Sequence, residues 1–66
     1  MDQENRIKKD ILSLLRKHKD GLTITDVSKL LGVHYITATK YLAVLHAEKK
    51  LIYRRIGMAK LFKLKG

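Results

Sequence analysis

The sequence contains no cysteine, no proline and no tryptophan, and its uninterrupted apolar runs never exceed five residues. Without cysteine the chain cannot form disulfide bonds or thiolate zinc sites, and it fits a reducing compartment. A helix needs about 20 consecutive apolar residues to span a bilayer, so the short runs exclude one. No apolar signal-peptide region follows the acidic start at residues 1–4. These absences predict a soluble, cytoplasmic protein.

No sequence feature marks a boundary between domains, because the 66 residues include no repeat, low-complexity tract or linker. A chain of this length has room for one hydrophobic core, and we expect residues 1–66 to form a single domain. A single Asn, a single Gln and 32% charged residues resemble the composition of proteins from thermophilic hosts.

Acidic side chains are scarce in the second half of the chain. The sequence has 15 Lys and Arg against six Asp and Glu, a formal net charge of +9. Residues 1–33 carry seven basic and five acidic side chains, whereas residues 34–66 carry eight basic side chains and one acidic one, Glu48. Such an excess favours a polyanionic partner. Lysine-rich surfaces also keep small proteins soluble, so only the positions of the cations can distinguish a binding surface from a merely soluble one.

The first element is predicted to be an amphipathic helix from Asp2 to about His18, ending near residue 19. Its apolar residues recur with the 3.6-residue period of a helix, and Gly21 can supply a left-handed stop. The apolar positions are Ile7, Ile11, Leu14 and Leu15, with Leu12 on the flank.

A short strand and a second helix are expected next. The alternation in residues 22–24 predicts a short strand, and Thr25 is expected to cap a helix over residues 26–31. The core face of this helix is predicted to be Val27, Leu30 and Leu31. Ser28 and Lys29 are expected to face outward.

A tight turn at residues 32–34 is expected to lead into a third helix, because Gly32 permits a positive φ and Val33 can fill the space between two helices. The third helix is predicted from Tyr35 to Lys49. Its inward sector holds Ala38, Tyr41, Leu42 and Leu45. Its outward sector holds Ile36, Thr39, Lys40, Ala43 and Ala47, with His34 and Tyr35 at the N-terminal end.

The last third of the chain predicts a β-hairpin. Residues 51–56 are β-branched, aromatic and alternating, which favours a strand. Residues 57–60 are expected to form a glycine-centred loop, and residues 61–64 the returning strand. The predicted fold class is therefore α+β, with three helices, a short strand and a C-terminal two-stranded hairpin.

This order of elements resembles the winged helix-turn-helix of small bacterial and archaeal transcription regulators of the MarR/ArsR-like group. The resemblance covers nearly the whole chain and is carried by residues 22–42, Leu45 and residues 50–55, which enter the wing. His34 stands where the family commonly has Ser, and Lys50 where it usually has Gly before the wing strand. The resemblance implies sequence-specific binding to double-stranded DNA by a transcription regulator.

Groove dimensions indicate how such a fold would bind. The major groove, about 12 Å wide, admits one helix, and flanking elements contact phosphates. Thr39 and Lys40 can hydrogen-bond bases or phosphates, Ile36 and Ala43 can pack on thymine methyls, and a basic wing can lie on phosphates or enter a minor groove. The candidate DNA-binding residues are His34, Tyr35, Ile36, Thr37, Thr39, Lys40, Ala43, Arg54, Arg55, Lys60 and Lys63.

Several of these residues have a plainer interpretation. An exposed Ile36 is normal on a protein surface, and the wing cations can be a solvated strand face protected from edge pairing. Thr37 is either core-adjacent or a phosphate contact, and Tyr53 stacks either on the wing or at an interface. The three histidines lack partners at ligand spacing, so no metal site is expected.

Catalysis, binding of a protein partner and binding of RNA or single strands are the alternatives to duplex binding. No nucleophile, base and orienting group can be identified, so the chain is not expected to be an enzyme or to need a cofactor. A winged helix can also bind a protein partner. Binding of RNA or single strands ranks third, because the four aromatic residues form no stacking platform.

A homodimer is expected, because small regulators usually engage two half-sites. Its interface is predicted at the first helix and the chain termini, around Leu12. The sequence gives no evidence of a small-molecule ligand or of membrane association.

Overall fold

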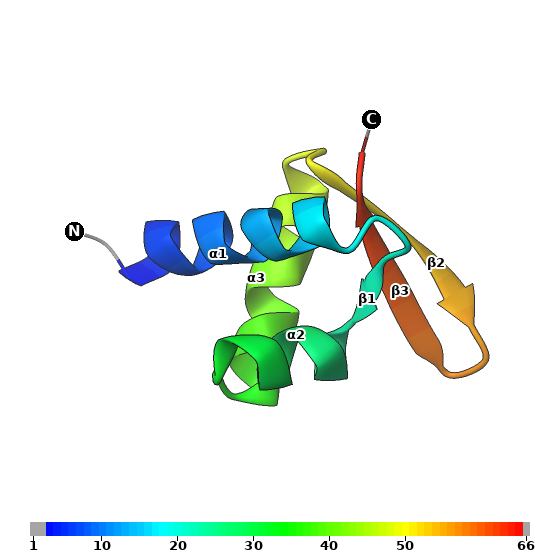
Figure 1. Cartoon of the computed structure of the whole chain (residues 1–66), viewed down its shortest axis with the longest axis horizontal. Helices are drawn as coiled ribbons and strands as arrows, with labels where there is room; N and C mark the ends of the chain where they lie inside the picture. Colours follow the sequence, from blue (N-terminus) through cyan, green and yellow to red (C-terminus); the bar gives the residue numbers. More distant parts are fainter. Residues whose placement is uncertain (1–2, 66) are drawn as a thin grey trace.

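The fold is known from a computed structural model that describes residues 3–65. Three helices pack on one side of a small antiparallel sheet (Figure 1). Helix α1 crosses α3, and the turn of the hairpin projects beyond the helices. The elements are α1 (Gln3–Lys17), β1 (Leu22–Thr23), α2 (Ile24–Leu31), α3 (Tyr35–Ala47), β2 (Leu51–Ile56) and β3 (Ala59–Leu64). The arrangement is a winged helix-turn-helix of the α+β class, as the sequence predicts.

Helix α1 buries the stripe that its periodicity indicates. Ile11 and Leu15 are fully buried, and Ile7, Leu12 and Leu14 pack against the core from its margin. The predicted start at Asp2 lies outside the described residues, and the helix ends at Lys17, two residues before the predicted end. Because Leu12 packs against the core, only part of its surface is available for the dimer interface predicted there.

The cap of α2 is Thr23, and the prediction of Thr25 is wrong. The Thr23 hydroxyl accepts a hydrogen bond from the Asp26 amide (3.1 Å), and the Asp26 carboxylate accepts one from the Thr23 amide (3.1 Å). This reciprocal capping box satisfies two donors at once. It starts the helix at Ile24, two residues before the predicted start, so the strand is shortened to Leu22–Thr23.

The inward stripe of α2 also differs from the prediction. Val27 is buried and Leu31 is half-buried, but Leu30 is 54% exposed. Ser28, predicted to face outward, is partly buried because its hydroxyl donates to the carbonyl of Val33 (2.8 Å). That bond ties the helix to the following turn, where Gly32 adopts the left-handed conformation (φ 67°) that ends the helix.

Helix α3 ends at Ala47, two residues before the predicted Lys49. Lys49 itself takes the left-handed conformation (φ 64°). The amide of Lys49 donates to the carbonyl of His46 (2.9 Å), and the amide of Lys50 donates to that of Leu45 (3.0 Å). This is the Schellman pattern, which usually has a glycine at the left-handed position. The corner into the wing is therefore made at Lys49.

The sheet has the strand order β1-β3-β2, with all pairs antiparallel. The predicted four-residue loop is wrong: Ile56 pairs with Ala59, so the turn consists of Gly57 and Met58 alone. A two-residue hairpin accepts a glycine with positive φ at its first position, and Gly57 has φ 61°. As a result Lys60 belongs to β3 and pairs with Arg55.

Every helix and strand contributes to one core. Its buried members are Ile11, Leu15, Leu22, Val27, Ala38, Tyr41, Leu42, Leu45, Leu51 and Phe62. The four inward positions predicted on α3 are all among them. Within residues 3–65, no helix is long and apolar enough to cross a membrane.

An ion pair joins α1 to the end of α3. Lys8 Nζ donates to Glu48 Oε2 (2.9 Å), and Lys50 Nζ lies 3.6 Å from Glu48 Oε1. The hydrogen bond from Lys8 and, to a lesser extent, the charges of Lys8 and Lys50 lower the pKa of Glu48 below its ordinary value of 4.5, although desolvation of the carboxylate opposes them. A carboxyl with a lowered pKa stabilises the fold above its unfolded-state pKa, and this stabilisation is lost as the pH falls through the folded-state pKa.

Glu48→Gln is therefore expected to lower the melting temperature slightly at pH 7 and to leave it unchanged once the pH lies well below the lowered pKa of Glu48, where both proteins are neutral at this position. Thermal melts followed by circular dichroism at several pH values measure the difference. Lys8→Met should also lower the melting temperature at pH 7, and its difference from the parent should likewise disappear at low pH. A difference between Glu48→Gln and the parent that stays constant from pH 7 to pH 3 would contradict the ion-pair explanation.

Candidate nucleic-acid interface

The outward face of α3 is exposed as the sequence predicts. Its residues share the side of the helix opposite the buried stripe, and Ile36 is 69% exposed. The exposed set is Tyr35, Ile36, Thr39, Lys40, Ala43 and Ala47. The alanines and Thr39 are small, so another surface can approach the helix closely there.

His34 caps α3 through its side chain. Its Nδ1 accepts a hydrogen bond from the amide of Ile36 (3.1 Å). Because Nδ1 is the acceptor, the neutral ring carries its proton on Nε2. His34 is exposed, so this N–H can donate to an anionic oxygen. Thr37, in the first turn of the same helix, is half-buried, which leaves part of its side chain accessible.

Thr39 and Lys40 offer opposite hydrogen-bonding chemistry on adjacent positions. The Thr39 hydroxyl donates to the carbonyl of Tyr35 (2.9 Å), one turn earlier. Since its proton is engaged, the oxygen is left as an acceptor, which suits a base amino group better than a phosphate. Lys40 is exposed, with its Nζ 5.3 Å from the ring centroid of Tyr41, and it can only donate.

The four wing cations expected to act together lie on two faces of the sheet. Successive side chains in a strand point to opposite faces, and directly paired residues share a face. Arg55 pairs with Lys60, and these two lie on the face that packs against α3. Arg54 and Lys63 alternate with them and lie on the opposite face, called here the back face of the sheet.

Aromatic rings fix the face that lies toward α3. The ring of Tyr53 lies 5.3 Å from that of Phe62 and 4.9 Å from the imidazole of His46 on α3. Lys60 Nζ lies 4.8 Å from the centroid of the same Tyr53 ring. Of the two positions that the sequence leaves open for Tyr53, the structure shows stacking on the wing. The Tyr53 ring thus holds the Lys60 ammonium beside α3.

Two hollows line this side of the molecule. The first, of about 160 Å³, lies between α3 and the sheet and is lined by Ile24, Thr39, Ala43, His46, Tyr53, Lys60 and Phe62. The second, of about 300 Å³, lies toward the hairpin turn and is lined by Thr23, Ile24, Thr25, Tyr35, Met58, Ala59 and Lys60. Ile24 and Lys60 line both, so the two hollows adjoin. The start of α2, the exposed side of α3 and the wing form one concave surface.

The sequence prediction includes Thr39 and Ala43 of this concave surface but misses His46. The three residues are spaced i, i+4, i+7, which places them on one helical stripe, so the signal for His46 is readable in the sequence. Thr25 and Met58 join the surface through the packing of α2 beside the hairpin turn, which no local pattern indicates. The predicted residues Arg54 and Lys63 lie on the back face instead.

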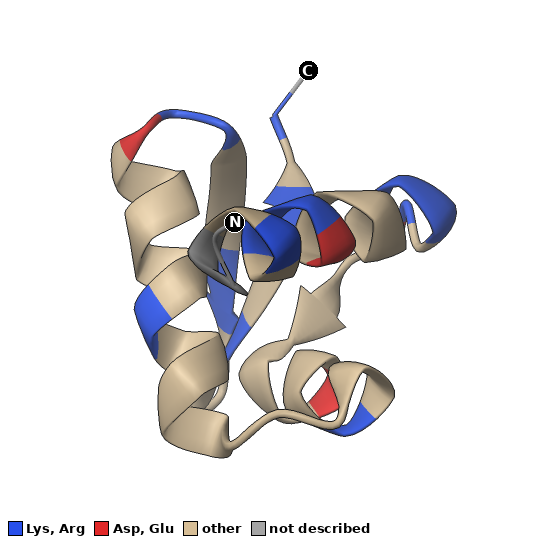
Figure 2. Cartoon of the chain, turned by 90° about the vertical axis from the view of Figure 1, so that its left-hand side faces the viewer, with Lys and Arg blue, Asp and Glu red and all other residues tan. Residues whose placement is uncertain are grey.

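The cations are distributed unevenly over this half of the molecule. Figure 2 shows α3 mostly without charge, whereas basic segments follow it in the loop and in the hairpin strands. Lys40 is the one Lys or Arg within residues 35–47. In the described part of the chain, no three His, Asp or Glu side chains are grouped closely enough to hold a metal ion. The concave surface is thus a weakly charged helix beside a cationic strand pair.

Comparison with known families finds one match over most of the chain. Residues 1–63 match the family described as "Bacterial protein of unknown function (DUF977)". Comparison with curated proteins finds no match.

Proposed function

We propose that this chain, which belongs to the DUF977 family, binds double-stranded DNA with α3 in the major groove and the wing on adjacent phosphates or in the minor groove. One observation carries the proposal: the exposed side of α3 and the cationic face of the hairpin border the same concave surface. A duplex presents bases in a groove about 12 Å wide, bordered by phosphates, so one surface of this kind can contact both.

The residues of α3 support a role in base contact. Small side chains at Thr39 and Ala43 allow the helix to enter the groove, and the free acceptor of Thr39 matches the amino group of adenine or cytosine. Lys40 matches the acceptors of guanine, and the exposed Ile36 can cover a thymine methyl. Together these groups can distinguish base pairs.

Residues around the helix support phosphate contact. Arg55 and Lys60 lie side by side on the face toward α3, and His34 Nε2 offers a further donor at the start of the helix. Phosphate contacts fix the register of a protein on the duplex, whereas base contacts supply specificity. We place this activity in transcription regulation by a cytoplasmic protein, in keeping with the resemblance to MarR/ArsR-like regulators; the proposal includes no catalytic role.

Binding to a random 20-base-pair duplex, measured by fluorescence anisotropy over a range of salt concentrations, tests the proposal. If Lys40, Arg55 and Lys60 each neutralise a phosphate, log K should fall against log salt with a slope of about −3 per protomer. Amide resonances of Thr39, Lys40, Arg55 and Lys60 should shift on titration with the duplex. A flat salt dependence, or a response confined to another surface, would exclude the proposal.

A protein partner is the second candidate, and exposed apolar side chains favour it. Ile36 on α3 and Met58 at the hairpin turn are exposed, and Met58 lines one of the two hollows. Exposed apolar side chains beside a concave surface occur at protein interfaces. Absence of duplex binding at low salt would favour this candidate.

A further inference from the structure

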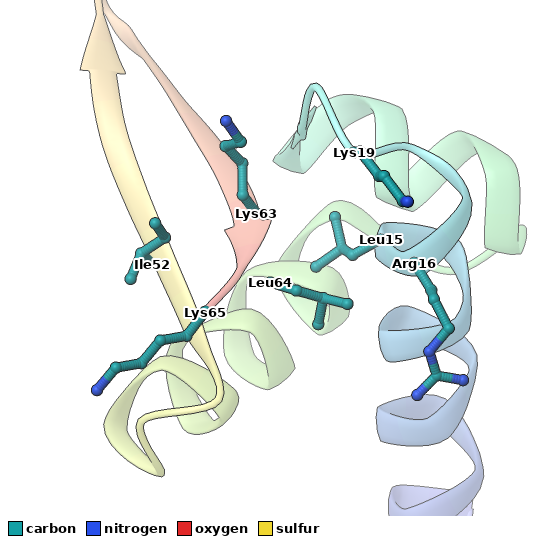
Figure 3. A pocket seen from close by; sticks show the side chains of 7 residues that line it. All are labelled: Leu15, Arg16, Lys19, Ile52, Lys63, Leu64 and Lys65. Carbon is teal, nitrogen blue, oxygen red and sulfur yellow. The ribbon is translucent and has the colours of Figure 1, made fainter.

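A second cationic surface lies on the other side of the wing base. It surrounds an open cavity of about 560 Å³ between the C-terminal end of α1 and the strands β2 and β3 (Figure 3). The cavity is called here the cationic cavity at the wing base, and its lining residues are Leu15, Arg16, Lys19, Ile52, Lys63, Leu64 and Lys65. None of these residues lines the two hollows beside α3, so this surface is separate from the one proposed to bind DNA.

The apolar side chains of the cavity offer little surface to a ligand. Leu15 is only 1% exposed, and Leu64 is half-buried against the core. Ile52, on the back face of the sheet, is the one well-exposed apolar residue of the lining, at 47%. An apolar body placed here would therefore gain little from burial, and charge dominates the accessible lining.

Four cations border the cavity without an acidic partner. They come from the end of α1 and from the end of β3 with the residue after it, and they are Arg16, Lys19, Lys63 and Lys65 (Figure 3). No acidic residue lines the cavity. Among residues 5–65, the ion pairs are those of Glu48 with Lys8 and Lys50. No ion pair within that range neutralises the four cations, and together they attract anions.

Arg54 extends this positive charge along the sheet. It is exposed on the back face, two residues after Ile52 in β2. Residues two positions apart in a strand share a face and lie about 7 Å apart. Lys63 pairs with Ile52 on the same face. The cations therefore extend from the end of α1 across the back face of the sheet.

We infer that this second surface binds the phosphate backbone of another duplex, so that one chain can hold two duplexes together. A duplex carries one negative charge per about 1.7 Å of its axis, so cations from a helix and two strands can each meet a phosphate. A small monoanion would leave most of these cations unpaired. A protein partner needs an apolar interface core, which Ile52 alone does not supply. The inference rests on the proposed function, because α3 and the wing face toward it hold the first duplex.

A bridging assay with the full chain tests the inference. One short random duplex is immobilised on beads, and an identical duplex carries a fluorophore. The chain should capture the labelled duplex on the beads. Four phosphate contacts release about four counterions, so the affinity for the second duplex should fall about 100-fold between about 0.05 and 0.2 M salt. Binding in fluorescence anisotropy without capture on beads would overturn this inference alone, whereas absence of both would also overturn the proposed function.

Charge removal at the cavity separates bridging from binding. Arg16→Gln combined with Lys19→Gln should weaken capture of the second duplex about 100-fold and leave the affinity for the first nearly unchanged. Lys9→Gln combined with Lys17→Gln removes the same charge from exposed positions on α1 that do not line the cavity, and it should preserve capture. Equal losses in the two double variants would show condensation by net charge. Full capture by the first variant would assign bridging to a dimer with two α3 surfaces, and either result would overturn the inference.

An NMR titration locates the second duplex. Amide resonances of Lys19, Ile52 and Lys63 should shift at a higher duplex concentration than those of Thr39 and Lys40. Simultaneous shifts of both sets would show that one duplex contacts both surfaces. Resonances around the cavity that stay unmoved with duplex but shift with poly-glutamate would assign the surface to acidic protein segments. Each of these two results would overturn the inference.

Discussion

Arg55→Gln combined with Lys60→Gln is expected to weaken binding to duplex DNA about 100-fold near 0.1 M salt and to reduce the salt slope by about 2. These residues are paired across the strands on the face toward α3, where the Tyr53 ring holds the Lys60 ammonium. Each lost phosphate contact removes the release of about one counterion, which contributes roughly tenfold in affinity at this salt concentration. Fluorescence anisotropy with a labelled duplex measures both quantities.

Two matched variants separate position from net charge. Lys9→Gln with Lys17→Gln removes the same charge from α1 and should have a much smaller effect, because exposed charges more than about 10 Å from a phosphate are largely screened. Arg54→Gln combined with Lys63→Gln removes two positive charges from the back face of the sheet. If the back-face variant loses more affinity than the Arg55 and Lys60 variant, the duplex does not lie along α3 as proposed.

Gly21→Ala is expected to destabilise the fold by about 3 kcal/mol, which for a domain of this size lowers the melting temperature by about 12–24 °C. Gly21 has φ 101°, a conformation that residues with a side chain rarely adopt. A Cβ there would lie 2.8 Å from Leu61 Cγ, 2.9 Å from Lys63 Cγ and 3.0 Å from the carbonyl oxygen of Phe62. Because Phe62 is buried in the core and paired with Leu22, the strand cannot move away freely. Thermal and urea unfolding measure the loss.

Gly32→Ala provides the control. Gly32 has φ 67°, and nothing lies within 4 Å of a Cβ placed there. Its substitution should cost only the left-handed backbone conformation, about 1 kcal/mol. Equal losses for the two variants would show that the contacts of Gly21 with β3 are not tight. A Gly21→Ala protein as stable as the parent would show that the loop before β1 can take another path.

One error in the sequence interpretation had a local signal that resolves it. Both Thr23 and Thr25 can cap a helix, but only Thr23 has an acidic residue three positions later, Asp26. The capping box needs that spacing, because the N3 carboxylate must reach back to the cap amide. A second error, the length of the hairpin loop, follows from counting Ala59 and Lys60 with the turn. Their pairing with Ile56 and Arg55 is decided by register and not by composition.

The order of the elements and the buried side of α1 and α3 were determined by the sequence alone, because helical and strand periods are properties of neighbouring residues. Ala38, Tyr41, Leu42 and Leu45 needed no tertiary information. The partition of the wing cations between two faces, the concave surface beside α3 and the cationic cavity at the wing base were decided by the tertiary structure. Each depends on contacts between distant segments, such as the pairing of Leu22 with Phe62, and a local pattern carries no record of those.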